Sequence, residues 1–292
     1  MTVAIGEKID EKISDKIGEK IGELTLTLGK GPLFIHSDPF RTARLVPRSR
    51  DRAALLESHL DVLTIAAAGR GLWLPSFNYD FPRTKRFDLE NDPCQLGPLP
   101  EHFRQTRQEW RTPVPMFSVS GTGEVPEVGW GDETDPFGPE SIFAEMEKRD
   151  AVIVYYGDTF HFNTIVHYAE RKSGGPIYRY DKMFRGVVVI DGDEHPGFLD
   201  YHVRPLGSGL DYDWPRLLDE AIAAGVCVRL GGHREILAAS ARALTSHWVR
   251  AMRDDPFSLL DEKSQKWVRL AHEETGRRFM IGDFESPEPP QS

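Results

Sequence analysis

The residues of this sequence best suited to chemistry are a histidine and a glutamate three positions apart, His167 and Glu170. They follow an apolar segment, 151–156, that is typical of a buried strand, and a turn that opens at Gly157. If residues 163–170 form a helix, positions i and i+3 share a face, so Glu170 can accept a hydrogen bond from one ring nitrogen of His167 while the other points into a cleft. We therefore interpret His167 as a candidate general base.

The surroundings of His167 favour this interpretation over the more common one, in which a histidine is hydrogen-bonded within the core. Asn163 and Thr164 add polar groups one turn before His167. The position beyond the carboxyl end of a strand exposes side chains to the crevice where α/β sheets bind ligands. The sequence thus predicts a polar cluster at this point of the fold.

Several other chemistries lack their sequence signatures. There is no HExxH segment, no GxGxxG after a strand and no GxxxxGK[ST] loop, and residues 207–209 do not fit the GxSxG nucleophile elbow. Cys94 follows a proline and has no local base, so we interpret it as a small buried residue and not as a nucleophile. We expect no metal, although metal-assisted hydrolysis by His161, His167 and Glu170 stays open as a separate hypothesis.

The elements that would position these residues alternate between strands and helices. Apolar segments predict strands at 33–35, 71–74, 151–156, 187–190 and 226–228. Helices are predicted from a leucine row that stops at Gly69, from Pro139, around 163–170, from Trp214 to Gly225, around 233–253 and at 258–275. The segment 75–131 has no clean periodicity, and we interpret it as a substrate-contacting excursion. The pattern predicts an α/β fold with a central mixed β-sheet flanked by helices.

The N-terminal segment 5–24 differs from the rest of the chain. Isoleucine recurs there every four residues, at Ile5, Ile9, Ile13, Ile17 and Ile21. A period of four drifts by about 40° per repeat around a straight helix, and each glycine weakens the helix by about 1 kcal/mol. We expect a marginal helix that is either a docking or dimerising arm or, as we favour, a frayed extension with solvated charges. The predicted division is an extension over 1–28, one folded domain over 29–285 and a loose tail over 286–292.

Composition limits the class of protein. A chain of 292 residues with 39% hydrophobic and 28% charged residues resembles ordinary globular proteins and can bury a full core. A formal net charge of -10 without a basic stripe argues against a nucleic-acid partner and favours cationic small molecules. Two distant cysteines, no run of 18 apolar residues and no export signal predict a cytoplasmic location and no membrane partner.

Six segments occur in the order found in the aminoglycoside 3-N-acetyltransferase family, which this sequence resembles over roughly residues 31 to 205. They are Pro75 to Phe81 with Phe87-Asp88, Gly97 to Arg104, Arg111-Thr112, Phe117-Ser118, Pro136 to Ser141, and Asn163 to Glu170. The resemblance implies a coenzyme A dependent N-acyltransferase with the antibiotic acetyltransferase fold, which is distinct from the GNAT fold.

The reaction that this resemblance implies moves an acetyl or other short acyl group from acyl-CoA to the amine of an amino sugar such as an aminoglycoside. The amine attacks the thioester directly in a ternary complex, with acyl-CoA as co-substrate and no metal. His167 would be the base, and Glu170 would orient it and raise its basicity. The oxyanion would need donors, for which Thr164, Ser118 and backbone N–H groups are candidates.

We also predict binding residues for each of the two substrates. The loop His36-Ser37-Asp38 is similar to the first coenzyme A contact of the family, and a short polar loop with the cation Arg41 suits amides and phosphates. The predicted coenzyme A residues are His36, Ser37, Asp38, Arg41, Phe117 and Ser118. The predicted acceptor residues are Tyr79, Asp80, Asp88 and Glu101. Helix capping by Asp38 and turn or surface roles for the acceptor carboxylates remain the alternatives.

The sequence also departs from the family pattern. Val114-Pro115 stands where many members carry His-Pro, and Arg48-Ser49-Arg50 replaces a usual Gly-Gly. Extra arginines would suit an acceptor that carries a diphosphate, so transfer to a nucleotide-linked amino sugar in polysaccharide or natural-product synthesis is an alternative. A different class remains as well: a non-catalytic ligand-binding or scaffold member, with a possible homo-oligomer formed through residues 5–24.

Overall fold

The structure, a computed structural model, describes residues 2–285, with side chains from residue 14 onward. The predicted loose tail 286–292 lies outside the described residues. A seven-stranded mixed sheet forms the centre, with strand order β4-β5-β2-β1-β6-β10-β9. Its middle strands β2 (Leu72–Pro75), β1 (Leu33–Ser37) and β6 (Val152–Tyr156) are parallel. The strands β5 (Val119–Gly121), β4 (Trp110–Arg111), β10 (His233–Ser240) and β9 (Cys227–Leu230) extend it antiparallel on both sides.

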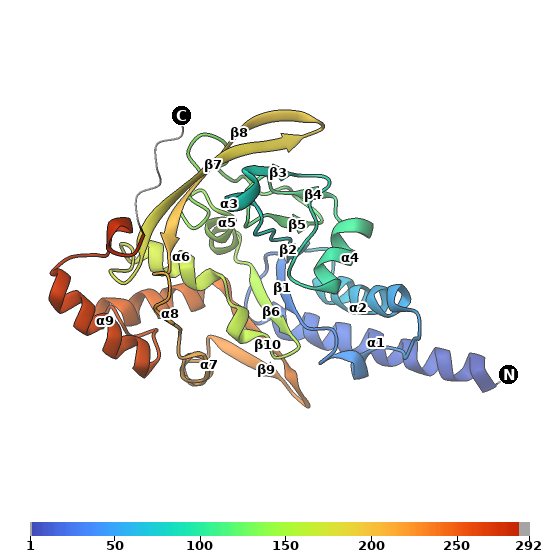
Figure 1. The fold of residues 1–292 in the computed structure, drawn as a ribbon. Coiled ribbons are helices and arrows are strands. Elements are labelled where there is room, and N and C mark those ends of the chain that lie inside the picture. Colours follow the sequence, from blue (N-terminus) through green and yellow to red (C-terminus); the bar gives the residue numbers. More distant parts are fainter. Residues whose placement is uncertain (1, 286–292) are drawn as a thin grey trace.

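Helices cover both faces of this sheet, as the sequence predicts (Figure 1). On one face, Leu33 and Ile35 of β1 pack in a core shared with α1 (Thr2–Leu26) and α2 (Arg52–Ala67). On the other, Phe34 packs in a core shared with α5 (Ile142–Lys148), α6 (Ile165–Lys172) and α8 (Ala241–Asp254). Alternate residues of a strand point to opposite faces, so one apolar strand supplies both cores.

The remaining elements surround these layers. The excursion 75–131 contains α3 (Phe81–Thr84), β3 (Arg86–Asp88), α4 (Pro98–Thr106) and the strands β4 and β5. Helix α7 (Trp214–Ala223) precedes β9 and α9 (Glu262–Thr275) follows α8, and single 3-10 turns lie at Ala43–Leu45, Phe160–Phe162 and Ile281–Asp283. None of the helices within residues 2–285 combines the length and apolarity needed to cross a membrane.

A second sheet of three strands is built mainly by one long hairpin, β7 (Tyr180–Ile190) and β8 (Asp193–Val203). Asp191 and Gly192 join its strands, and both have positive φ, which a two-residue hairpin turn requires. The sequence pattern predicted only 187–190 of this hairpin. Most of it was missed because one side of each strand is partly exposed, so the strands carry no continuous apolar run.

The prediction of a helix around 233–253 is wrong for its first eight residues. Residues 233–240 form β10, which pairs antiparallel with both β6 and β9. Alanine and leucine favour helices in isolation, but residues 236–240 are all buried, and residues 237–239 pair with strands on both sides. The helix α8 then begins at Ala241, where the Ser240 side chain accepts from the Ala243 backbone.

The favoured prediction of a frayed N-terminal extension is wrong for the part of α1 whose side chains are described. Ile17 and Ile21 are buried against α2. Gly18 and Gly22 let the two helices approach closely: a Cβ on Gly18 would lie 2.8 Å from the Val62 backbone oxygen. The start of α1 extends beyond the end of α2 (Figure 1). The glycines that weaken an isolated helix therefore permit its packing here.

Candidate active site

The histidine and glutamate predicted from the sequence lie on α6, which follows β6 as expected. Ile165, Val166 and Ala169 bury one side of this helix in the core. His167 Nδ1 and Glu170 Oε2 are 3.0 Å apart, with the His167 side chain 25% exposed and Glu170 fully buried. An ionised carboxylate only accepts hydrogen bonds, so Nδ1 carries the proton and Nε2 is left with a free lone pair.

Glu170 is the centre of a buried hydrogen-bond network. Its Oε1 accepts from the hydroxyls of Tyr178 at 2.8 Å and Tyr212 at 2.7 Å, and from Arg179 Nε at 3.3 Å. Its Oε2 accepts from His202 Nε2 at 3.0 Å in addition to His167. Arg179 Nη2 also donates to the Tyr212 hydroxyl at 2.8 Å. These bonds hold the carboxylate rigidly beneath the His167 ring.

The electrostatics of the network keep Glu170 charged and His167 neutral. Burial acts to raise the pKa of Glu170, but the Arg179 charge and the two imidazole hydrogen bonds outweigh it and hold that pKa well below its usual value. Burial lowers the pKa of His167, and the Glu170 hydrogen bond opposes this shift. Burial also lowers the pKa of His202 to about 4. The His167 imidazole is therefore an unprotonated base near neutral pH.

Two cavities meet beside this network, and Tyr79 and Thr164 line both. The larger, of about 430 Å³, contains His167, and six of its lining residues are Phe, Tyr or Trp. The smaller, of about 310 Å³, lies at the carboxyl end of β1 and contains His36 and Ser37. We call them the histidine cavity and the β1 cavity. Two ligands bound in them would meet next to Thr164.

The structure brings together about half of the predicted site residues. Thr164, Phe117 and Tyr79 line the histidine cavity with His167, whereas His36 and Ser37 line the β1 cavity. Burial lowers the pKa of His36 to about 3, so its ring is neutral, and its buried Nε2 has no hydrogen-bond partner among the described residues.

Asp38 and Arg41 lie just beyond the β1 cavity and form an ion pair of 3.4 Å. Arg41 also lines a surface hollow of about 730 Å³ together with Arg229, Arg234, Asp158 and Glu235. In this arginine hollow, Arg41 pairs with Asp158 at 3.3 Å, while the Arg234 side chain has no partner among the described residues. Arg41, predicted from the sequence, thus shares this hollow with Arg229 and Arg234, which the sequence pattern did not indicate.

Ser118 and the acceptor carboxylates predicted from the sequence do not line either cavity. Ser118 is fully buried and accepts from Arg111 Nε at 3.0 Å. Asp80 contacts the side chains of Arg83 and Gln95, and Asp88 accepts from Asn91. Glu101 forms an ion pair with Arg104 at 2.8 Å and accepts from the Cys94 backbone. These residues stabilise the turns and the helix that surround the cavities.

The residues that sequence reasoning missed are the partners of Glu170: Tyr178, Arg179, His202 and Tyr212. They come from the loop before β7, from β8 and from the segment before α7, so no local spacing connects them to Glu170. A tyrosine-rich stretch at 178–180 was the one available signal.

Ligand atoms of His167, Glu170 and His202 lie within 4.8 Å of one another, a grouping that could hold a metal ion. Here the two imidazoles donate to the carboxylate, so a metal would have to replace existing hydrogen bonds. His161, which the hydrolysis hypothesis included, lines the histidine cavity but is not part of this grouping.

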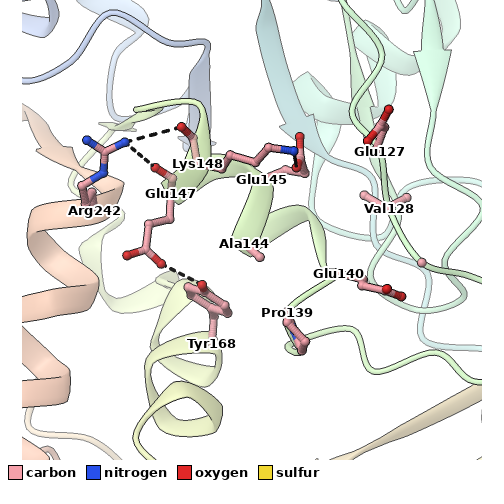
Figure 2. A pocket seen from close by; sticks show the side chains of 11 residues that line it. Glu127, Val128, Pro139, Glu140, Ala144, Glu145, Glu147, Lys148, Tyr168 and Arg242 are labelled. Carbon is pink, nitrogen blue, oxygen red and sulfur yellow. Dashed lines mark hydrogen bonds and ion pairs between the residues drawn. The ribbon is translucent and has the colours of Figure 1, made fainter.

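A further hollow of about 680 Å³ lies on another side of α6 (Figure 2). Tyr168 donates to Glu147 there at 2.7 Å, and Arg242 donates to the Glu147 backbone oxygen at 3.0 Å. Consecutive helix positions point about 100° apart, so Tyr168 faces away from the network around Glu170. None of the predicted site residues lines this hollow.

The fold resembles solved acetyltransferases. The chain is 16% identical to aminoglycoside acetyltransferase AAC(3)-Xa over 86% of this chain and 99% of that one, with a TM-score of 0.64. It is 14% identical to sisomicin-bound AAC-VIa over 82% of this chain and 97% of that one, with a TM-score of 0.62. It is 16% identical to AAC-IIIb in a binary complex with CoASH over 92% of this chain and 97% of that one, with a TM-score of 0.59. No curated protein matches the chain.

These likenesses agree with the fold class expected from the sequence, a central mixed sheet flanked by helices that is not of the GNAT type. A family model provides the more direct evidence. The model of the aminoglycoside 3-N-acetyltransferase family matches residues 72–253, which include α6 and all the hydrogen-bond partners of Glu170 described above. Because this match covers more than half of the chain, the protein belongs to this family of acyltransferases.

Proposed function

We propose that the protein transfers an acetyl group from acetyl-CoA to the amine of an amino sugar, with His167 as general base. The observation that carries this proposal is the position of His167: it lies on the wall of one cavity, held by a buried carboxylate, one helical turn from Thr164, which lines both cavities. Family membership gives the reaction class. The CoASH complex of AAC-IIIb and the sisomicin complex of AAC-VIa support coenzyme A and an amino sugar as ligands.

The β1 cavity suits the pantetheine arm of acetyl-CoA. Its lining is largely apolar, and Ser37 offers a hydroxyl to the amide groups of the arm, while His36 Nε2 is buried in the wall without a hydrogen-bond partner among the described residues. The arginine hollow is reached from the same loop, since Arg41 pairs with the residue after Ser37. Arg229 and Arg234 add the charge that phosphate groups require. The thioester would then lie near Thr164, where the two cavities meet.

The histidine cavity suits the acceptor. His167 Nε2 takes the proton from the attacking amine, and the new C–N bond forms as the thioester carbonyl becomes tetrahedral. Thr164 is the one predicted oxyanion donor that lines both cavities, so we assign it to stabilise the developing negative charge. Collapse of the intermediate breaks the C–S bond, and coenzyme A leaves with the proton that His167 carried. No acyl-enzyme forms.

Release of free thiol from acetyl-CoA with a panel of amino-sugar acceptors tests this proposal. We expect His167→Ala to lower kcat by at least about 10²-fold while coenzyme A affinity stays nearly unchanged, because His167 does not line the β1 cavity. His195→Ala is the matched control, since His195 lies on β8 outside both cavities.

Two outcomes would contradict the proposal. Unchanged kcat in His167→Ala would remove His167 from the mechanism. Saturable coenzyme A binding without thiol release for any acceptor would favour a non-catalytic member of the family. Longer acyl thioesters in the same assay would show whether the β1 cavity accepts groups larger than acetyl.

A further inference from the structure

The charges on the wall of the histidine cavity do not match a polycationic acceptor. The charged side chains that line this cavity are Arg179, Arg204 and Asp211. Arg179 is neutralised by Glu170 at 3.3 Å. The remaining pair, Arg204 and Asp211, gives the wall no surplus of negative charge, although the whole chain carries a formal net charge of -10. The acidic residues of the protein are therefore placed elsewhere.

An aminoglycoside carries several ammonium groups, and each one that is buried on binding needs a nearby carboxylate or other hydrogen-bond acceptors to compensate for its lost hydration. The carboxylates expected to provide this, Asp80, Asp88 and Glu101, contact their own side-chain and backbone partners and do not line the cavity. A cation on the wall adds like-charge repulsion against such a ligand. The cavity wall thus provides a single carboxylate, Asp211, for an acceptor class that carries several ammonium groups.

Arg204 is the cation that can select a different acceptor. It is exposed, it lies two residues after His202 and it lines the same cavity as His167. Its Nη1 donates to the Leu210 backbone oxygen at 2.9 Å, which fixes the guanidinium. Among the described residues no carboxylate pairs with it. Its remaining donors are free for a ligand oxyanion, which a guanidinium can bind through two parallel hydrogen bonds.

We propose that the acceptor of this protein is an amino sugar that also carries an oxyanion, phosphate or carboxylate, and that Arg204 binds this group. The inference rests on the proposed function, because it places the acceptor amine at His167. Aromatic residues of the cavity, among them Tyr79, Tyr201 and Trp214, provide flat surfaces for the sugar ring. The single acid Asp211 is available to a lone ammonium group.

Four acceptors that differ in charge test the proposal in the acetyl-CoA thiol-release assay. Glucosamine 6-phosphate and 2-amino-2-deoxyglucuronic acid carry phosphate and carboxylate at the same carbon, glucosamine carries neither, and sisomicin is a polycation. We expect kcat/KM to be about 10- to 100-fold higher for at least one anionic acceptor than for glucosamine, the size expected for one charged hydrogen-bonded contact. Comparison of the two anionic acceptors shows which oxyanion Arg204 prefers.

Variants of Arg204 connect any preference to this residue. Arg204→Gln should bring the ratio of kcat/KM between the anionic acceptor and glucosamine close to one, mainly through KM, and Arg204→Lys should restore part of it. Arg185→Gln is the control, since Arg185 is an exposed arginine of β7 outside both cavities and should keep the full ratio. Thermal melting of each variant checks that it folds. If Arg204→Gln does not fold, the ratio of kcat/KM measured for Arg204→Lys decides whether Arg204 sets the preference.

The results separate this inference from the proposed function. A higher kcat/KM for sisomicin or glucosamine than for both anionic acceptors would overturn the inference and leave the proposed function intact. An anionic preference that survives Arg204→Gln would overturn the role of Arg204. Absence of thiol release with all four acceptors, despite saturable coenzyme A binding, would overturn the proposed function and the inference with it.

Discussion

Glu170 has no contact with solvent, yet its charge determines how the imidazole beside it can act. A buried carboxylate is unfavourable unless it is paired and fully hydrogen-bonded. Glu170 meets this condition through Arg179 and four hydrogen-bonding side chains. The pairing fixes the His167 tautomer, because the carboxylate only accepts. Family membership does not show this arrangement, which comes from the geometry of α6 and the residues packed on it.

Glu170→Gln tests the role of this carboxylate in the pH dependence of the reaction. Removal of the charge leaves Arg179 facing His167 without compensation, so the pKa of His167 should fall further below its usual value. The acid limb of kcat/KM should therefore move to lower pH, while the plateau should drop by about 10²-fold or more because the tautomer is no longer fixed. The pH profiles of Glu170→Gln and the native protein provide the measurement.

The same variant should lose about 3–5 kcal/mol of unfolding free energy, because it leaves Arg179 buried and unpaired. Chemical denaturation at neutral pH measures this loss. Glu140→Gln is the control, since Glu140 is exposed and lies outside both cavities. An acid limb that stays in place in Glu170→Gln would show that the carboxylate does not set the His167 pKa.

At the level of elements, α1 packs against α2, and the sequence indicated this packing only in part. The four-residue spacing of isoleucine left a docking arm open as the less favoured alternative, and Ile17 and Ile21 do contact α2. The glycines were interpreted as weak points, because propensity describes an isolated helix. In the folded chain their missing side chains let two backbones approach, which only the position of α2 reveals.

Gly18→Val should therefore destabilise the packing of α1. The new Cβ would meet both the Ile65 side chain and the Val62 backbone oxygen at 2.8 Å, and overpacking of this kind costs about 1–3 kcal/mol. Glu19→Val places the same β-branched residue on the exposed side of the same helix and controls for helix propensity. Urea denaturation and limited proteolysis of residues 14–28 are the measurements. Equal stability of the two variants would contradict close packing at Gly18.

Three fully or nearly fully buried histidines tie the stability of the whole molecule to pH. Burial lowers the pKa of His36 to about 3 and that of His59 and His202 to about 4. Between pH 6.5 and about 4 the unfolded chain binds protons at these residues and the folded chain does not. The free energy of unfolding should therefore fall as the pH falls, by up to about 1.4 kcal/mol per pH unit for each histidine.

Urea denaturation between pH 4.5 and 7.5 measures this slope. His59→Gln should reduce the slope by the contribution of about one bound proton, because His59 is fully buried. The His59 ring contacts the Tyr156 hydroxyl at 2.8 Å, and a glutamine side chain can make the same hydrogen bond. A slope that is unchanged in His59→Gln would show that His59 does not contribute to the acid sensitivity. The carboxylate of Glu170 adds to the loss below about pH 4.5, where the unfolded chain binds a proton at Glu170 and the folded chain, whose Glu170 pKa is held well below the usual value, does not.

The sequence by itself determined the features of the protein that depend only on residues close together in the chain. The i, i+3 spacing placed His167 beside Glu170, apolar runs indicated the three parallel strands, and the order of motifs indicated the family. These features follow from helix geometry and from local burial, which short segments encode.

Only the tertiary structure decided which distant residues complete the site. His202, Arg179 and Tyr212 reach Glu170 because the hairpin of β7 and β8 and the segment before α7 pack over α6. The same packing puts Arg204 in the wall of the histidine cavity and directs Asp80, Asp88 and Glu101 to other partners. A sequence shows charge and residue type. It does not show which charges are neutralised and which stay unpaired, because the contacts that decide this arise only when remote segments pack together.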